Sequence, residues 1–206
     1  MTTLLLATRN PGKKREIQSL LKEIQPAIHI LSLRDANVDA DVEESGATFA
    51  ENARLKADFF SGLTGWDTLG DDSGLEVMAL DNRPGVFSAR YAGKGADDDE
   101  RIRKLLAEME NLQDRRARFV SAVCLSRAGH PLASFAGMVR GEILREKKGS
   151  HGFGYDPLFY YPPLGKTFAE LSLQEKNRVS HRARALQRVK NFMARGGLAP
   201  VPETDS

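Results

Sequence analysis

Strand-like and helix-like patterns alternate along the first half of the chain, and this alternation limits the folds that the chain can adopt. Residues 3–7 form a short apolar run typical of a buried strand, and a helical pattern follows at residues 14–23 after a Pro-Gly turn. A second strand is predicted at residues 29–33. Thr48 and Glu51 then match the capping box of a helix, which we expect to run to about residue 60. Alternation of this kind predicts an α/β fold.

The segments that follow predict further strands. One strand should end near Gly70, a tight turn should occupy residues 71–74, and another strand should cover residues 75–80. Residues 118–126 and 132–144 alternate in the manner of antiparallel strands, which makes the predicted sheet mixed and elongated. Helices are expected to flank this sheet. Further helix-start signals stand at Asp97, Thr167 and Ser172.

The overall composition excludes several classes of protein. With 30 basic and 28 acidic residues, the net charge of +2 is too balanced for a protein that binds a nucleic-acid polymer or a membrane surface. The longest N-terminal apolar run, residues 4–7, is too short for a signal sequence or a membrane span. The single Cys124 cannot form an internal disulfide and is expected to be buried. We therefore expect a cytoplasmic protein.

The length of the chain suits one domain with a substantial core. We expect residues 1–195 to form a single domain of two lobes that share a cleft. Residues 196–206 contain Gly and Pro without an apolar stripe, and they are predicted to form a flexible C-terminal tail.

The loop between the first strand and the first helix has the composition of a phosphate site. Free backbone N–H groups at a helix start favour phosphate, Lys13 adds a positive charge, and Thr8 and Asn10 can donate hydrogen bonds. The spacing of a Walker loop is absent. A polar helix cap with solvated lysines is the alternative interpretation. The candidate residues are Thr8, Arg9, Asn10, Pro11, Gly12 and Lys13.

Carboxylates gather at residues 39–44 and again at Asp71 and Asp72. Mg²⁺ usually takes one or two protein carboxylates and leaves its other positions to water and substrate phosphates. Neighbouring side chains of an extended backbone point to opposite faces, so one member of each pair should face a site. A solvated acidic loop and a plain Asp-Gly turn are the alternatives.

A second cluster, near the C-terminus, combines an aromatic ring with basic side chains. Phe153 stands between glycines, which let the backbone approach a flat molecule closely. His181 and Arg182 follow a predicted helix cap and could face a ligand, although a lone His is more often packed in the core. A core position is likewise the alternative for Phe153, and Lys56, placed on the exposed side of its helix, would ordinarily be solvated. Together with the N-terminal loop, this cluster predicts a nucleotide pocket built from both ends of the chain.

In this order, these motifs resemble the inosine triphosphate pyrophosphatase family, in its bacterial branch of dITP/XTP pyrophosphatases. The resemblance extends from about residue 4 to the last helix and leaves out the tail. The matching positions are Thr8, Asn10 and Lys13; Glu44, Ser45, Gly46, Thr48, Phe49, Glu51, Asn52, Ala53, Lys56 and Ala57; Asp71, Asp72, Ser73, Gly74 and Leu75; Pro84, Gly85, Val86, Ser88, Ala89, Arg90 and Tyr91; Phe153, Gly154, Tyr155, Asp156 and Pro157; and Lys176, Ser180, His181 and Arg182.

The resemblance implies a Mg²⁺-dependent homodimer with a central nucleotide cleft. Such an enzyme hydrolyses deaminated purine nucleoside triphosphates (ITP, dITP and XTP) to the monophosphate and pyrophosphate, and so cleanses the nucleotide pool. Carried over by position, residues 8–13 and Lys56 bind the triphosphate, Glu44 and Asp72 hold Mg²⁺, and Asp72 is also the proton acceptor. The remaining substrate-binding positions are Ser73, Phe153, Gly154, Tyr155, Asp156, Lys176, His181 and Arg182.

Several alternatives stay open at this point. Glu43 is the alternative to Glu44 as a metal ligand, and Asp72 could orient a metal-bound water instead of accepting its proton. Arg182 or backbone donors are expected to read O6 of the base. A septum-formation-type nucleotide pyrophosphatase and a nucleotide-binding sensor without turnover are the competing functions.

Overall fold

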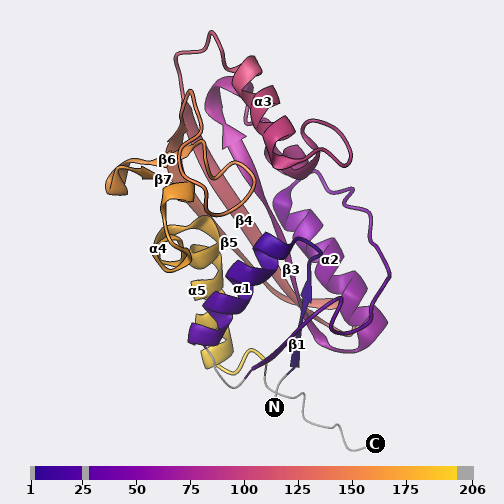
Figure 1. Ribbon diagram of the computed structural model, residues 1–206. Coiled ribbons are helices and arrows are strands. Elements are labelled where there is room, and N and C mark those ends of the chain that lie inside the picture. Colours follow the sequence, from indigo (N-terminus) through magenta and orange to yellow (C-terminus); the bar gives the residue numbers. More distant parts are fainter. Residues whose placement is uncertain (1–2, 25–27, 199–206) are drawn as a thin grey trace, which may run out of the picture.

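The computed structural model describes residues 3–24 and 28–198, and it contains one mixed sheet of seven strands (Figure 1). The strands lie in the order β2-β1-β3-β4-β5-β6-β7. β1 pairs in parallel with β2 and β3, whereas the later pairs are antiparallel. This sheet confirms the predicted α/β fold. The strands are β1 (Thr3–Ala7), β2 (His29–Ser32), β3 (Asp67–Val77), β4 (Arg116–Arg127), β5 (His130–Ile143), β6 (Phe159–Tyr161) and β7 (Lys166–Thr167).

Five α-helices flank the sheet in the described part of the chain. The capping boxes predicted at Thr48, Thr167 and Ser172 are present, and Asp97, predicted as a helix cap, also forms one. None of the helices within residues 3–24 and 28–198 is long and apolar enough to cross a membrane. The α-helices are α1 (Pro11–Ile24), α2 (Phe49–Thr64), α3 (Asp98–Glu108), α4 (Leu173–Val179) and α5 (His181–Ala194), and the short 3-10 helices are η1 (Met78–Leu80), η2 (Gly85–Arg90), η3 (Pro162–Leu164) and η4 (Phe168–Glu170).

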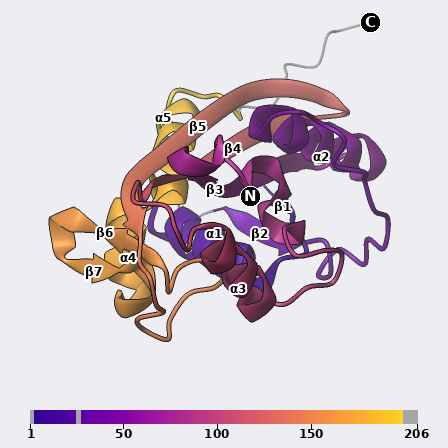
Figure 2. The ribbon, with the colours of Figure 1, turned by 90° about the horizontal axis from the view of Figure 1, so that it is seen from above.

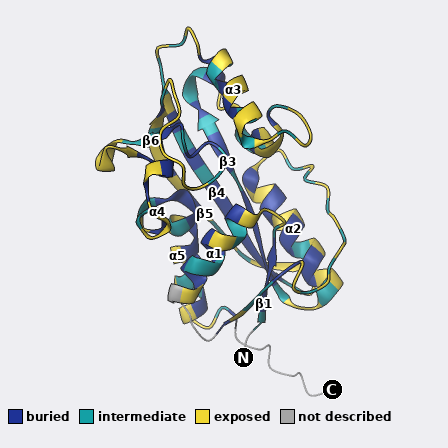
Figure 3. Ribbon diagram, viewed as in Figure 1, coloured by how far each residue is buried: buried dark blue, intermediate teal, exposed yellow. Residues whose placement is uncertain are grey.

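Alternate residues of β1 point to opposite faces of the sheet and so divide the helices between the two faces. Leu4 and Leu6 pack with apolar residues of α1 and α5, whereas Leu5 and Ala7 pack with Phe60 of α2. α1 and α5 therefore lie side by side on one face, and α2 covers the other (Figures 1 and 2). The buried sides of these helices are turned toward the sheet in Figure 3.

A separate group of buried residues fills the other end of the sheet. It joins the end of β3 to α3, to the paired strands β4 and β5, and to residues 155–171. The middle of β3 lies between this group and the packing around α1 and α5. Its buried members are Leu75, Val77, Leu80, Tyr91, Ile102, Leu105, Met109, Ala117, Phe119, Val139, Ile143, Tyr155, Leu158, Phe159, Phe168 and Leu171.

The predicted turn at residues 71–74 is wrong, because β3 continues through these residues without interruption. The two glycines of the segment serve close packing instead of chain reversal. A Cβ atom on Gly70 would lie 2.2 Å from the carbonyl oxygen of Ala53 in α2, and one on Gly74 would lie 2.3 Å from Ser88 Oγ. As a consequence, Asp71 and Asp72 are consecutive strand residues and their side chains leave opposite faces of the sheet.

Other boundaries differ less from the prediction. α1 begins at Pro11, earlier than expected, because proline is well suited to the first helical position. Leu198, which was assigned to a loose tail, is instead buried against the apolar residues of α1 and α5, and its carbonyl accepts a hydrogen bond from Arg127. The tail prediction is therefore wrong at Leu198, while residues 199–206 lie outside the described part of the chain. Cys124 is buried as expected.

Candidate active site

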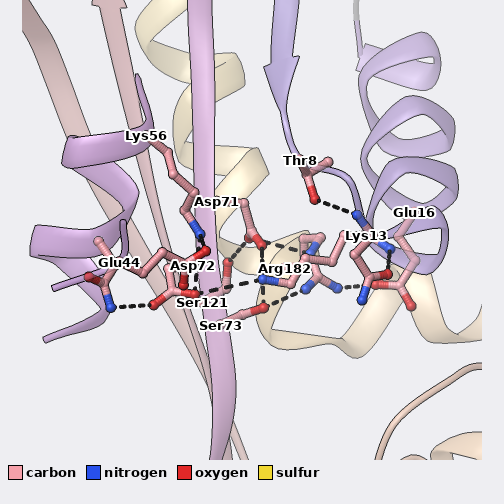
Figure 4. Close-up of polar contacts among 12 residues, drawn as sticks. Thr8, Lys13, Glu16, Glu44, Lys56, Asp71, Asp72, Ser73, Ser121 and Arg182 are labelled. Carbon is pink, nitrogen blue, oxygen red and sulfur yellow. Dashed lines mark hydrogen bonds and ion pairs between the residues drawn. The ribbon is translucent and has the colours of Figure 1, made fainter. Parts of the chain in front are cut away.

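The candidate site lies where β1 ends and β3 continues beyond it. Ala7 is paired with Gly70, so the chain leaves β1 for the start of α1 beside Asp71 and Asp72 (Figure 4). The start of α5 reaches the same place from the C-terminal half of the chain, and it brings Arg182 to Asp71. The prediction that both ends of the chain build one site is consistent with this arrangement.

Asp71 is a buried carboxylate held by several partners on the face covered by α1 and α5. Lys13 Nζ lies 3.0 Å from its Oδ2 atom, Arg182 Nε donates to Oδ1 at 3.4 Å, and Ser121 Oγ donates to Oδ1 at 2.8 Å. Burial alone would raise the pKa of Asp71, but the charges of Arg182 and Lys13 outweigh burial and hold this pKa far below its usual range. Asp71 is therefore a fixed negative charge.

Asp72 faces the opposite side of the sheet, toward α2, and its environment is different. Asn52 Nδ2 donates to its Oδ2 atom at 3.2 Å, and Lys56 Nζ donates to Oδ1 at 3.4 Å. Lys13 is more distant from Asp72, at 3.8 Å. Burial raises the pKa of Asp72 above its usual value, and the opposing effects of Lys13 and Lys56 do not cancel this rise. Of the two neighbours, Asp72 is thus the one that binds a proton more readily.

Lys56 is buried, so the expectation that it lies on the exposed side of α2 is wrong. It follows Ala53 by three residues on the helix, which places it on the same inner face. Its ammonium group donates to Glu44 Oε1 at 3.0 Å as well as to Asp72. Lys56 therefore brings the carboxylates of Glu44 and Asp72 to one point, whereas the side chain of Glu43 is exposed.

A row of alternating buried charges connects Asp71 with the residues around Phe153. Arg182 pairs with Asp71 and with Glu16 of α1. Lys176 Nζ lies 2.7 Å from Glu16 Oε1 and also pairs with Asp156. Each charge has an opposite neighbour, which is the condition under which buried ions are tolerated.

Glu16 is the member of this row that sequence reasoning missed. It is buried between Arg182 and Lys176, and these two cations lower its pKa although burial acts in the opposite direction. The available signal was its position three residues after Lys13, on a helix side that also carries the buried Ile17 and Leu20. A carboxylate inside an apolar helix stripe needs a buried cation as its partner.

Two cavities adjoin at this site and share Asn10, Lys13, Ser73 and Ala89. The first, of about 550 Å³, we call the aromatic cavity, and the second, of about 730 Å³, the charged cavity. The aromatic cavity is also lined by Gly74, Ser88, Asp98, Arg101, Phe119, Phe153, Gly154, Tyr155, Asp156, Lys176, His181 and Arg182. The charged cavity is also lined by Ala7, Thr8, Arg9, Leu33, Asp41, Val42, Glu44, Lys56, Phe60, Asp72 and Val86.

The ring of Phe153 forms a wall of the aromatic cavity. It lies over Gly12, where a Cβ atom would come within 2.4 Å of Phe153 Cδ1, and Lys176 Nζ is 5.0 Å from the ring centroid. His181 stacks on Phe119 with ring centroids 4.8 Å apart. Burial, together with the nearby Arg182 and Lys176, lowers the pKa of His181 well below its usual value, so its ring is neutral. Its Nδ1 atom has no hydrogen-bond partner among the described residues.

The predicted site residues gather around these cavities, except for Pro11 and Gly12, which line neither of them. Pro11 faces a separate surface hollow beside Thr8 and Lys14. Gly12 contributes close packing under Phe153. Arg9 is exposed at the edge of the charged cavity, where its guanidinium donates to the carbonyl oxygen of Ala40 at 2.7 Å.

Known proteins are similar to this sequence over most of its length. Residues 4–192 match the Ham1 family. A dITP/XTP pyrophosphatase from Staphylococcus epidermidis is 43% identical over 193 residues, which cover 94% of this chain and 97% of that protein. A dITP/XTP pyrophosphatase from Geobacter sulfurreducens is 46% identical over 200 residues, which cover 96% of this chain and all of that protein.

Solved structures of Ham1 proteins are also similar to this chain. The Staphylococcus aureus Ham1 protein superposes with a TM-score of 0.84 at 41% identity and covers 95% of this chain. A HAM1 protein from Coxiella burnetii gives a TM-score of 0.85 at 42% identity and also covers 95% of this chain. In both comparisons the whole of the solved chain is matched. The motifs, the fold and these relatives lead to one conclusion: the chain belongs to the Ham1 family.

Proposed function

We propose that this protein hydrolyses deaminated purine nucleoside triphosphates (ITP, dITP and XTP) to the nucleoside monophosphate and pyrophosphate, with Mg²⁺ as cofactor. The class of enzyme follows from the Ham1 family and from relatives named dITP/XTP pyrophosphatase. The observation that carries the substrate assignment is the pair of adjoining cavities, because the rings of Phe119, Phe153 and Tyr155 line one of them, whereas Lys56, Glu44 and Asp72 line the other. Such an activity would remove deaminated bases from the nucleotide pool.

The charged cavity is suited to the triphosphate. Lys13 and Lys56 line it from two helices, α1 and α2. The phosphate charge must be neutralised before water can attack the α-phosphorus, and fixed cations supply this at little cost in reorganisation. These two lysines contact Asp71, Asp72 and Glu44.

Glu44 and Asp72 fit a magnesium ion. Their carboxylates meet at Lys56, and no group of three or more His, Cys, Asp or Glu side chains suited to a metal occurs in the described residues. A site with two carboxylates leaves positions for water and phosphate oxygens, which is the pattern that Mg²⁺ prefers. When bound, the ion would polarise the phosphate and lower the pKa of water.

Asp72 is the residue that we assign to the attacking water. Its pKa is raised by burial, so it can take a proton, whereas Asp71 is held ionised by Arg182 and Lys13. Asn52 fixes one oxygen of Asp72 and leaves the other on the side of Lys56 and Lys13, where the phosphates would lie. We propose that Asp72 orients the water and accepts its proton.

The aromatic cavity would hold the nucleoside, with Phe153 against the base. Hypoxanthine and xanthine carry an acceptor at O6 and a donor at N1, whereas adenine has a 6-amino donor and a bare N1. Arg182 already donates to Glu16, Asp71 and Ser73, which reduces the donors that it can offer to O6. We therefore add His181 Nδ1, buried without a partner among the described residues, to the groups that read the base. A base that left such groups unpaired would be rejected.

A homodimer and a cytoplasmic location belong to the same proposal. Leu55, Phe59 and Leu63 form an exposed apolar stripe on α2, with Trp66 beyond its end. Apolar stripes of this kind are common at interfaces between subunits. Sedimentation velocity should therefore give the mass of two chains, and Leu63→Asp should shift the protein toward one chain.

A panel of nucleoside triphosphates tests the proposed reaction. With Mg²⁺, we expect ITP and XTP to react well ahead of GTP, and ATP to react roughly 100-fold more slowly than ITP, because adenine leaves buried groups unpaired. Separate assays for phosphate and pyrophosphate should find pyrophosphate alone. Faster turnover of modified pyrimidine nucleotides would instead support a septum-formation-type enzyme, and binding without turnover would support a sensor.

The metal assignment is tested by a pair of neighbouring substitutions. A chelator should abolish activity and Mg²⁺ should restore it. Glu44→Gln should raise the Mg²⁺ concentration needed for half-maximal activity about tenfold, because one carboxylate ligand is lost. Glu43→Gln removes the same charge from an exposed neighbour and should leave the requirement unchanged. A larger effect at Glu43 would show that the assignment within this pair is reversed.

Substitution by Asn should affect turnover at Asp72 and stability at Asp71. Asp72→Asn should reduce turnover about 1000-fold, because the proposed proton acceptor is lost. It should not reduce stability, because burial disfavours the charged form of Asp72 in the folded state. Asp71→Asn should reduce stability by about 3 kcal/mol near neutral pH, because Arg182 and Lys13 lose their buried partner.

The pH dependence of stability separates the two aspartates further. The pKa of Asp71 is lowered in the folded protein, so its stabilising contribution is present above the ordinary value of 3.8 and is lost as the pH falls through the lowered pKa. In urea unfolding, wild type should therefore have a higher free energy of unfolding than Asp71→Asn above pH 3.8, and the difference should narrow as the pH falls below 3.8.

An Asp72→Asn variant with full turnover would contradict the assignment of Asp72 to the attacking water.

A further inference from the structure

The first turn of α3 closes the side of the aromatic cavity that lies beyond Phe153. Asp98 and Arg101 of this turn line the cavity together with Ala89 and Gly154. Of these four residues, only Ala89 also lines the charged cavity. The turn is therefore placed to act on the nucleoside half of the site and not on the phosphates.

Asp98 holds the loop that carries Phe153. Its Oδ2 atom accepts a hydrogen bond of 2.6 Å from the backbone N–H of Gly154, the residue after Phe153. The backbone N–H of Phe153 itself donates to Asp156 Oδ2 at 2.9 Å. Two carboxylates thus fix consecutive N–H groups of this loop, Asp156 from within the loop and Asp98 from α3.

The Asp98 carboxylate is itself fixed by Arg101. The guanidinium of Arg101 pairs with Asp98 Oδ1, and its Nη1 atom donates to the carbonyl oxygen of Ala89 at 2.9 Å and to that of Ala96. Arg101 therefore ties Asp98 to the end of η2, which borders both cavities. Hydrogen bonds run without interruption from Ala89 through Arg101 and Asp98 to Gly154.

Gly154 needs such an anchor because its backbone is unusual. Gly154 has a φ angle of +63° and Gly152, on the other side of Phe153, has +76°. Glycine in this region has many alternative conformations, so a loop flanked by two such residues loses considerable entropy when it is fixed. A loop that is already ordered before the ligand arrives binds more tightly, because this loss is not incurred during binding.

We propose that Asp98 is a positioning residue for the nucleoside: it fixes the Gly154 backbone and thereby holds the Phe153 ring in place for the base. The inference rests on the proposed function, in which Phe153 contacts the base. Asp98 itself acts through Gly154 and not through the phosphates or the metal ligands.

Three variants and two ligands test this role. Inosine monophosphate carries the base and sugar, whereas inorganic tripolyphosphate carries only the phosphates. Asp98→Ala should weaken binding of inosine monophosphate about tenfold in calorimetry and leave tripolyphosphate binding unchanged, because a single hydrogen bond to a charged acceptor is lost. The KM for ITP should rise more than kcat falls.

Two matched variants separate positioning from a general effect of charge. Asp98→Asn keeps an acceptor for the Gly154 N–H and should retain most of the affinity for inosine monophosphate. Asp99→Ala removes the same charge from the next residue, whose carboxylate pairs with Lys147 at 2.9 Å on the surface, and it should bind both ligands like the wild type. Amide hydrogen exchange at Gly154 should be faster in Asp98→Ala only.

Different results would contradict the positioning role of Asp98 and the proposed function. Equal weakening of both ligands, or an equal effect from Asp99→Ala, would show that Asp98 acts on the fold or on the overall charge. A wild-type protein that hydrolyses ITP, with an Asp98→Ala variant that binds inosine monophosphate equally well, would overturn the inference alone. A wild-type protein that neither hydrolyses ITP nor binds inosine monophosphate would overturn the proposed function.

Discussion

The buried contact between Asp71 and Arg182 is the interaction on which the site depends. It joins the middle of β3 to the start of α5, and through Glu16 and Lys13 it also fixes the start of α1. These elements come from three distant parts of the chain, and apolar packing alone would not set the direction of their polar groups. A buried ion pair does so, because an unpaired charge in this place would be strongly destabilising. The position of the neighbouring Asp72 follows from this arrangement.

One strand thus presents two aspartates that serve different ends. The alternation of side chains along β3 directs Asp71 to the buried Arg182 and Asp72 to Lys56, while Lys13 lies within 4 Å of both aspartates. The two cavities would hold different parts of the substrate: we expect the phosphates in the charged cavity and the base beside Phe153 in the aromatic cavity. Lys13, Asn10, Ser73 and Ala89 border both cavities, so we expect the junction between sugar and phosphate to lie beside them.

Local patterns in the sequence predicted the parts of the fold that local physics determines. Strand alternation, helix stripes and capping signals predicted the α/β sheet and the starts of the helices that follow Thr48, Asp97 and Ser172. The predicted turn at residues 71–74 failed because glycines in a strand can serve close packing instead of chain reversal. Helical spacing could have placed Lys56 and Glu16 on the buried sides of their helices, but their ion-pair partners and the contact of Asp98 with Gly154 lie far away in the chain, so local patterns did not reveal these contacts.

The most direct test of the account is a titration of the two aspartates by carbon-13 NMR of their carboxyl groups in the metal-free protein. We expect Asp72 to titrate above its ordinary pKa of 3.8, because burial disfavours its charge, and Asp71 to remain ionised at all pH values at which the protein is folded. Asn substitutions at each position would assign the two signals. A protein in which Asp71 titrates above Asp72, or in which both titrate near 3.8, would contradict the division of roles proposed for this pair.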